Sequence, residues 1–285
     1  MRPVDFDYAA PEDIAGVVQA LVDGGDDAKI ISGGQSLMPV LRMRMAAPEL
    51  LVDLRKVDGL REIRQEGSEL VIGAMVTHHT LATDPLVAEH AGLLAQAAAT
   101  IGDAQIRYRG TIGGALAHAD PAGDLGAAVL ALDGSVDIVG PAGERTVGAA
   151  EFFQDYFTTA VGEDDVAVAV RIPSHAGWGS CYEKFTVVAQ AWAVVAVGAT
   201  LRIADGVIQE AKVAMANMGP TPLRASQVEA ALAGAAVDAG TLDAAGSRAG
   251  EGTNPPEDSA GTPEYRRHLA GVLARRALRS AAGVE

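Results

Sequence analysis

The sequence has 285 residues, 49% of them hydrophobic, which is enough apolar material for one large core or several small ones and excludes a chain that is disordered throughout. The formal net charge of -15, from 37 acidic and 22 basic residues, argues against a nucleic acid partner, because recognition of phosphates requires a positive surface. The single cysteine, Cys181, cannot form a disulfide within the chain and offers no Cys-x-x-Cys spacing for zinc or an iron–sulfur cluster.

The first part of the chain predicts a helix, a strand, a glycine loop and a second helix, in that order. Residues 11–21 place apolar side chains on one helical face, with Pro11 in the first turn. Residues 28–31 then predict a short strand that leads into a glycine loop at 32–36. One or two helical turns are expected over 37–43.

The middle of the chain alternates short strands and helices around a second glycine loop at 111–114. Two glycines in the stretch 173–179 indicate a domain boundary after the last strand of this part. The expected strands cover 50–54, 69–75, 135–139, 144–147 and 166–172, and the expected helices cover 85–89, 92–101 and 124–132.

The last part of the chain predicts an antiparallel sheet followed by a closing helix. Long strands are expected over 180–187, 193–203 and 207–218, and Asp205-Gly206 is typical of a tight hairpin turn. The segment 250–263 is polar and rich in Gly and Pro, so we expect it to need a partner or ligand for its ordering. Residues 265–280 restore a helical pattern.

The two glycine loops share one design. Each places a Gly-Gly pair beside a hydroxyl residue, Ser36 in the first loop and Thr111 in the second. Without Cβ atoms, the backbone N–H groups of such loops can approach an anion closely. Either loop alone would be an ordinary turn, but the two together predict a clamp on a dinucleotide pyrophosphate. Neither has the Gly-x-Gly-x-x-Gly spacing, so the doubly wound dinucleotide fold is disfavoured.

Motifs along nearly the whole chain match one known family in order and spacing. They are SGGQSL at 32–37, LLVDL at 50–54, IGA at 72–74, QIR at 105–107, RGTIGG at 109–114, HADP at 118–121, YEKF at 182–185, NMGPTPLR at 217–224 and YRRHL at 265–269. With these motifs the chain resembles the medium, flavin-binding subunits of the xanthine oxidase and aerobic carbon monoxide dehydrogenase family.

The resemblance implies an α+β fold of the vanillyl-alcohol-oxidase (PCMH) type. FAD-binding subdomains at 1–55 and 56–175 would hold FAD between them, and a C-terminal α+β domain with an antiparallel sheet at 176–285 would cover it. It also implies a small partner subunit with two [2Fe-2S] clusters and a large one with a molybdenum cofactor, assembled as a dimer of heterotrimers. Electrons would pass from molybdenum through the clusters to FAD, and on to a quinone, dioxygen, a carrier or NAD.

The resemblance assigns FAD contacts to both glycine loops and to three side chains beyond them, and it assigns no catalytic or metal-binding residue to this chain. The loop residues would hold the pyrophosphate mostly through backbone N–H groups. Ala115 departs from the Asn often found there, so a side-chain contact is lost. The loop residues are Ser32, Gly33, Gly34, Gln35, Ser36, Leu37, Thr111, Ile112, Gly113, Gly114 and Ala115.

Three further side chains are implied near the cofactor, and each has a plainer interpretation. Asp124 would contact the nucleotide, or it would only cap the helix that follows. Lys184 would lie near the isoalloxazine and stabilise negative charge there, or it would be a solvated strand lysine. Trp192 would lie close to the flavin ring, or it would pack in an ordinary core.

Two groups of residues suggest other chemistry, but we expect neither to have it. The pair His78 and His79 invites a metal site, yet adjacent side chains point apart, so capping or surface placement is expected. Met38, Met43 and Met45 are expected to fill gaps in a small core.

Two other functions stay open at the level of sequence. A stand-alone FAD oxidase is one, although no covalent attachment motif for flavin and no substrate base occur in the loops. A non-enzymatic nucleotide-binding module is the other. The chain has no apolar signal core at 1–5 and no run of eighteen apolar residues, so we expect a cytoplasmic protein that meets a membrane only through partners.

Overall fold

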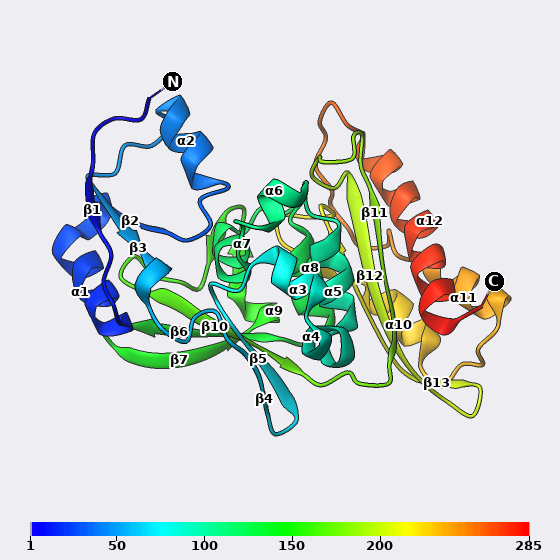
Figure 1. Cartoon of the computed structure of the whole chain (residues 1–285). Helices are drawn as coiled ribbons and strands as arrows, with labels where there is room; N and C mark the ends of the chain where they lie inside the picture. The colour runs from blue at the N-terminus through cyan, green and yellow to red at the C-terminus, as the bar shows by residue number, and fades with distance from the viewer. Residues whose placement is uncertain (1, 285) are drawn as a thin grey trace.

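A computed structural model describes residues 2–284, and a three-stranded parallel sheet forms its N-terminal part (Figure 1). The strands are β1 (Asp7–Ala9), β2 (Ala28–Ile31) and β3 (Leu50–Asp53), in the order β1-β3-β2. Helix α1 (Ile14–Gly24) packs against β2 and β3, and α2 (Leu37–Met43) follows the first glycine loop.

Helix α1 begins three residues later than Pro11, where the sequence pattern predicted its start. The Asp13 side chain accepts a hydrogen bond from the Gly16 N–H at 2.7 Å and so caps the helix. The prediction that Met43 and Met45 fill gaps in a core was also wrong, because Met43 at the end of α2 and Met45 just beyond it are 57% and 73% exposed, whereas Met38 is half-buried. Helix α2 has too few neighbours to bury its C-terminal turn.

The middle part is an antiparallel five-stranded sheet covered by helices, with the strand order β4-β5-β10-β6-β7. Its strands are β4 (Ile63–Glu66), β5 (Glu69–Gly73), β6 (Ser135–Gly140), β7 (Gly143–Gly148) and β10 (Val166–Pro173). The helices are α3 (His78–Thr83), α4 (Pro85–His90), α5 (Gly92–Ala99), α6 (Ala104–Arg107), α7 (Ile112–His118), α8 (Asp124–Ala131) and α9 (Ala149–Phe152), and a small pair of strands, β8 (Phe153–Asp155) and β9 (Thr158–Thr159), completes this part.

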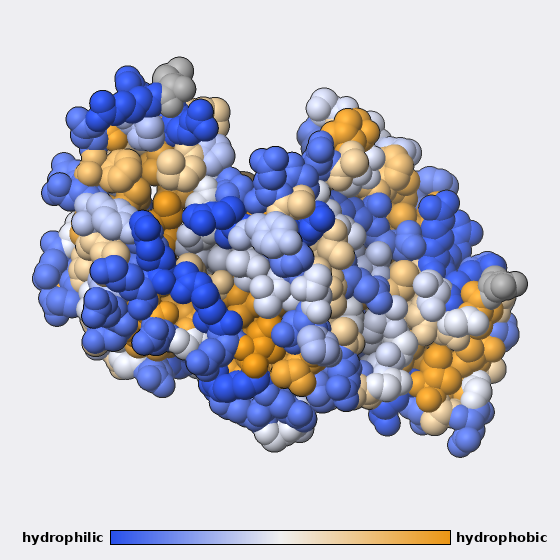
Figure 2. Space-filling view, in the orientation of Figure 1, coloured by the Kyte–Doolittle hydropathy of each residue, from blue (hydrophilic) through white to orange (hydrophobic). Residues whose placement is uncertain are grey.

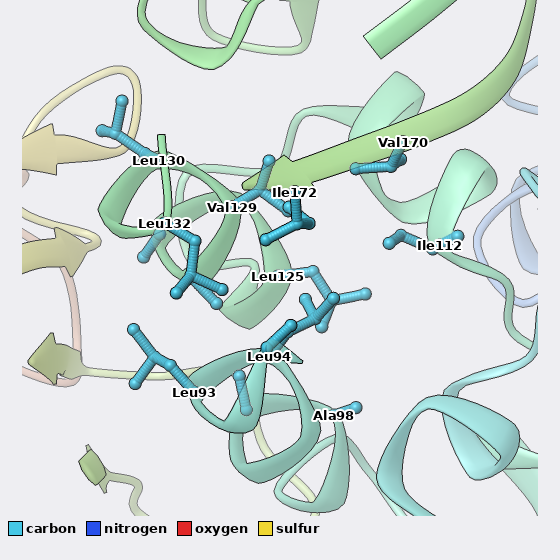
Figure 3. Packing of buried hydrophobic residues seen from close by; sticks show 14 of the residues in the cluster. Leu93, Leu94, Ala98, Ile112, Leu125, Val129, Leu130, Leu132, Val170 and Ile172 are labelled. Carbon is cyan, nitrogen blue, oxygen red and sulfur yellow. The ribbon is translucent and has the colours of Figure 1, made fainter. Parts of the chain in front are cut away.

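Helix α8 is the centre of the largest hydrophobic core. Every residue of α8 is buried, because it packs on α5 on one side and on the C-terminal sheet on another. Figure 3 shows Leu94 of α5 close to Leu125 of α8, with Leu93 of α5 on the side of Leu132 and Ile172 of β10 near Leu125. A helix that is apolar all round belongs in such a position. Its one charged residue, Asp124, is therefore carried into the interior.

The C-terminal part is a four-stranded antiparallel sheet with helices on one face (Figure 1). Its strands are β11 (Gly179–Phe185), β12 (Val195–Ala204), β13 (Val207–Ala216) and β14 (Leu223–Arg224). Helices α10 (Ser226–Leu232), α11 (Ala239–Gly246) and α12 (Pro263–Ala282) complete it, with α12 packed on β11 and β12. Asp205 and Gly206 both have positive φ, as the tight turn requires. The predicted α+β class and antiparallel C-terminal sheet are confirmed.

The segment 250–263 is ordered by contacts within this chain, so the expected need for a partner was wrong. The guanidinium of Arg266 in α12 donates to Asp258 at 2.6 Å. The N–H of Asn254 donates to the carbonyl of Met218, and Arg267 donates to the carbonyl of Thr253. Arginines of α12 thus provide polar partners that composition alone did not reveal. Among residues 2–284, no helix is both long enough and apolar enough to cross a membrane.

Candidate functional site

A cavity of about 610 Å³ lies between the N-terminal part, the middle helices and the start of the C-terminal sheet. Its walls come from the first glycine loop and α2, from α6 and α7, from the first turn of α8, and from the segment between β11 and β12. Helices α2 and α6, labelled in Figure 1, both line this cavity, and Figure 2 shows the surface recessed between them.

The cavity brings together the predicted site residues of both glycine loops with the three side chains beyond them. Ile112 is the exception: it does not line the cavity and is fully buried in the largest core. It is the first residue of α7, and its side chain turns inward toward the sheet. The lining residues among those predicted are Ser32, Gly33, Gly34, Gln35, Ser36, Leu37, Thr111, Gly113, Gly114, Ala115, Asp124, Lys184 and Trp192.

The first glycine loop presents unused hydrogen-bond donors to the cavity. Within residues 2–284, the backbone N–H groups of Gly33, Gly34, Gln35 and Ser36 donate to no acceptor. The loop turns through Gly34, whose φ of 73° lies in the left-handed region that glycine adopts without strain. Consecutive unpaired N–H groups at a bend form an anion-binding concavity.

The second loop differs, because the N–H groups of its residues 112–115 already have partners. Those of Ile112 and Gly113 donate to the carbonyls of Val76 and Ala74, at 3.0 and 2.9 Å. That of Gly114 donates to the Thr111 hydroxyl, which caps α7. Four of the five backbone donors expected from this loop, those of residues 112–115, are therefore used within the protein.

The glycines of both loops permit close packing. A Cβ at Gly33 would lie 2.8 Å from the Cα of Gly110 and closer still to the carbonyl oxygen of Arg109. The hydroxyls of Ser32 and Thr111 are 2.6 Å apart and join the loops by a hydrogen bond. The two loops thus cross in van der Waals contact at the cavity wall.

A buried ion pair lies at another wall of the cavity. Lys184 Nζ is 2.7 Å from Asp124 Oδ2, and their side chains are 6% and 2% exposed. The hydroxyl of Tyr182 donates to Asp124 Oδ1 at 2.9 Å. Burial raises the pKa of Asp124, and the ammonium and hydroxyl beside it oppose that rise. Burial, together with the nearby carboxylate, also raises the pKa of Tyr182.

The plainer interpretations of these two charged residues are wrong. Gly123 is the N-cap of α8, and the Asp124 side chain caps nothing. Lys184 is not a solvated strand lysine, because it points inward from β11 to the first turn of α8. Desolvated charges that pair at a cavity wall are candidates for a functional role.

Trp192 lies on the connection between β11 and β12 and is 54% exposed, so it is not an ordinary core residue. It lines the cavity together with Gln190 and Ala191. Val187 and Val188 on the same connection are 68% and 60% exposed. The connection 187–192 therefore exposes apolar side chains beside the cavity.

His78 is a cavity residue that the sequence pattern misassigned to the surface. It is 5% exposed and lines the cavity, and Nδ1 of its ring has no hydrogen-bond partner. Thr77, not a histidine, caps α3. His79 points elsewhere and stacks on Tyr108 with ring centroids 4.0 Å apart. Among residues 2–284, no group of three or more His, Cys, Asp or Glu side chains could hold a metal ion.

Comparison with protein families assigns both halves of the chain. Residues 4–175 match the family described as "FAD binding domain in molybdopterin dehydrogenase". This chain belongs to that family. Residues 180–281 match the "CO dehydrogenase flavoprotein C-terminal domain". The resemblance found in the motifs is confirmed, and the chain is an FAD-binding medium subunit of the molybdenum hydroxylase type.

Individual relatives match over almost their whole length. The carbon monoxide dehydrogenase medium chain of Afipia carboxidovorans is 38% identical, with 99% of this chain and 98% of that one covered. The nicotine 6-hydroxylase medium subunit of Paenarthrobacter nicotinovorans is 35% identical, with 95% of each covered. A chain of the carbon monoxide dehydrogenase structure from Hydrogenophaga pseudoflava superposes with a TM-score of 0.96 at 39% identity, with 99% of each chain covered.

The residues around the cavity fit FAD. The cavity volume is in the range of small-molecule sites, and its walls combine apolar side chains with a few placed polar groups. The free N–H groups at the first loop suit a pyrophosphate. The glycines at the loop crossing let the two loops pack in contact, which places the free N–H groups of the first loop at the cavity wall.

Proposed function

We propose that this chain holds FAD in the cavity and relays electrons from a partner iron–sulfur subunit to an external acceptor. In this arrangement the pyrophosphate lies on the first glycine loop, and the isoalloxazine lies toward Lys184 and Trp192. The second loop packs against the first, and the backbone N–H groups of its residues 112–115 are already hydrogen-bonded within the protein. Bound FAD would supply the redox centre, since it can take up electrons singly and release them to an acceptor.

One observation carries this proposal: the free N–H groups of the first glycine loop. Gly33, Gly34 and Ser36 are half-buried at the cavity wall. Backbone donors in such places are almost always paired in proteins, so these unpaired ones indicate a ligand with acceptor atoms. A pyrophosphate supplies such atoms and a negative charge. The matched family binds FAD, which contains this group.

The ion pair has a second role in the proposal. Lys184 keeps a positive charge at the cavity wall, where it stabilises negative charge on a ring bound beside it. Asp124 and Tyr182 fix the position of the ammonium. Trp192 lies half-exposed beside the same space, so it limits solvent access to the ring and packs against its edge.

The assembly and the acceptor are also part of the proposal. The chain would join a small subunit with two [2Fe-2S] clusters and a large subunit with the molybdenum cofactor, as a dimer of heterotrimers with domains at 1–55, 56–175 and 176–285 in this chain. The acceptor would be a quinone, dioxygen, a carrier or NAD. The relatives are named for different substrates, carbon monoxide and nicotine among them, which fits substrate choice on the large subunit.

The test is the identity of the flavin in the protein isolated from its native host. Acid release and chromatography should recover FAD at about one per chain. Recovery of FMN alone, of no flavin, or of flavin that stays attached after denaturation would contradict the proposal. Replacing Lys184 by Met should lower the midpoint potential of the bound flavin, because the positive charge that favours the reduced ring is removed.

A further inference from the structure

The His78 side chain lies directly behind the crossing of the two glycine loops. Its backbone N–H donates to the carbonyl of Gly110 at 2.9 Å. A Cβ at Gly110 would lie 2.6 Å from the Nε2 of His78, so any side chain at position 110 would clash with the imidazole. Gly110 is also the residue that Gly33 touches. Gly110 therefore contacts both the imidazole of His78 and the first glycine loop, whose backbone N–H groups are free.

The imidazole is neutral at ordinary pH. Burial, and to a smaller extent the nearby guanidinium of Arg107, lower the pKa of His78 to about 4. A neutral imidazole has one N–H and one lone pair. Nδ1 is buried without a partner, and an orphaned N–H is rarer in proteins than an unsatisfied acceptor. The favoured tautomer therefore carries its proton on Nε2.

The cavity residues of the segment 101–110 beside His78 have no polar side chain; they are Ile101, Gly102, Ile106 and Gly110. The hydroxyls of Ser32 and Thr111 at the loop crossing also line the cavity, but they are hydrogen-bonded to each other and to Met75. A ligand at the first loop would meet apolar surface on this side apart from the imidazole. A neutral donor also avoids the cost of burying a cation beside Arg107.

We propose that His78 is a further cofactor-binding residue, whose Nε2–H donates to a phosphate oxygen of FAD held on the first glycine loop. The inference rests on the proposed function and deepens it by adding a side-chain contact to a site otherwise made of backbone. Gly110 is then a functional glycine, because it makes room for the ring that reaches the phosphate.

The test compares two variants in the deflavinated full-length chain. His78→Phe keeps a ring but removes the donor, whereas His78→Gln keeps an N–H donor at a similar reach. Binding of FAD and of ADP is measured by calorimetry, since ADP carries both phosphates and no flavin. We expect His78→Phe to weaken binding of both ligands about tenfold or more, the usual effect of losing a hydrogen bond to a charged group, and His78→Gln to restore most of it.

The matched control is His79→Gln, because the neighbouring histidine stacks on Tyr108 and does not line the cavity. It should bind both ligands like the wild type. If His78→Phe also binds ADP like the wild type, the inference is overturned while FAD binding stands. If the wild-type chain binds neither ligand, the proposed function fails as well. If His78→Phe does not fold, His78→Met replaces it. The inference is then overturned if His78→Met binds ADP as tightly as His78→Gln and the wild type do.

Discussion

Replacing Gly33 by Ala should separate the two glycine loops and weaken FAD binding. The added Cβ would lie 2.8 Å from the Cα of Gly110, against ordinary contacts that begin at 3.4 Å. The loops must therefore move apart by about 0.6 Å, and by more to clear the carbonyl oxygen of Arg109. Both neighbours are backbone and cannot swing aside, so overpacking costs roughly 1–3 kcal/mol. The same movement stretches the hydrogen bond between Ser32 and Thr111.

Gly34→Ala is the matched control, since it changes the next glycine of the same loop. Its Cβ would meet the flexible Met38 side chain at 3.2 Å and point away from the loop crossing. An alanine at the positive φ of 73° costs roughly 1–2 kcal/mol of stability. The contact between the two glycine loops and the free N–H groups of the first loop are unchanged by this substitution. We expect Gly33→Ala to lose FAD about tenfold more readily than Gly34→Ala, measured as flavin per chain and as Kd. Equal retention in folded samples of both variants would refute the role of the crossing.

The remaining predictions concern buried charge in the flavin-free chain, measured by urea unfolding. Asp124→Ala should cost roughly 3–5 kcal/mol because it leaves Lys184 buried and unpaired, and the double change with Lys184→Met should cost less than Asp124→Ala alone. His78 has a folded pKa of about 4, below the unfolded 6.5, so it contributes stability above pH 6.5 that is lost as the pH falls through 4. That loss is about 3 kcal/mol, and His78→Gln should abolish it; the same acid sensitivity in wild type and variant would contradict the burial of the ring. Arg266→Met should lower the free energy of unfolding by roughly 1–3 kcal/mol, since the Val194 carbonyl then keeps only the longer hydrogen bond from the Asn217 side chain; an unchanged midpoint would show that the guanidinium is not buried.

The glycine loops could be found in the sequence, but the division of labour between them could not. Gly-Gly pairs beside hydroxyl residues are visible as local patterns, and the family motifs give their common ligand. The partners of the second loop are Val76 and Ala74, more than thirty positions earlier in the chain. Which backbone N–H groups stay free depends on such hydrogen bonds between distant parts of the chain, and these cannot be predicted from a local sequence pattern.

Burial of polar residues was the other point that local pattern missed. Asp124 was predicted near the cofactor from the family motifs, but its burial follows from the position of α8 between α5 and the C-terminal sheet. His78 was expected to cap a helix or lie at the surface, because the side chains of adjacent histidines point apart and so suggest no shared site. Gly110 is the residue that could have indicated the burial of His78, because a side chain there would clash with the imidazole. This contact is visible only in the folded chain. Strands were predicted well where short runs are mostly apolar, as in β2 and β10, although each contains one basic residue.

The most direct test of the relay uses the complex from the native host with its partner subunits. The [2Fe-2S] clusters of the partner are reduced chemically without air, an electron acceptor is added, and cluster reoxidation is followed by electron paramagnetic resonance. Reoxidation should be fast in the intact complex, at least about tenfold slower in a deflavinated one, and restored by added FAD. Equal rates with and without FAD, or a chain that purifies alone and oxidises an organic substrate with its own flavin, would contradict the account.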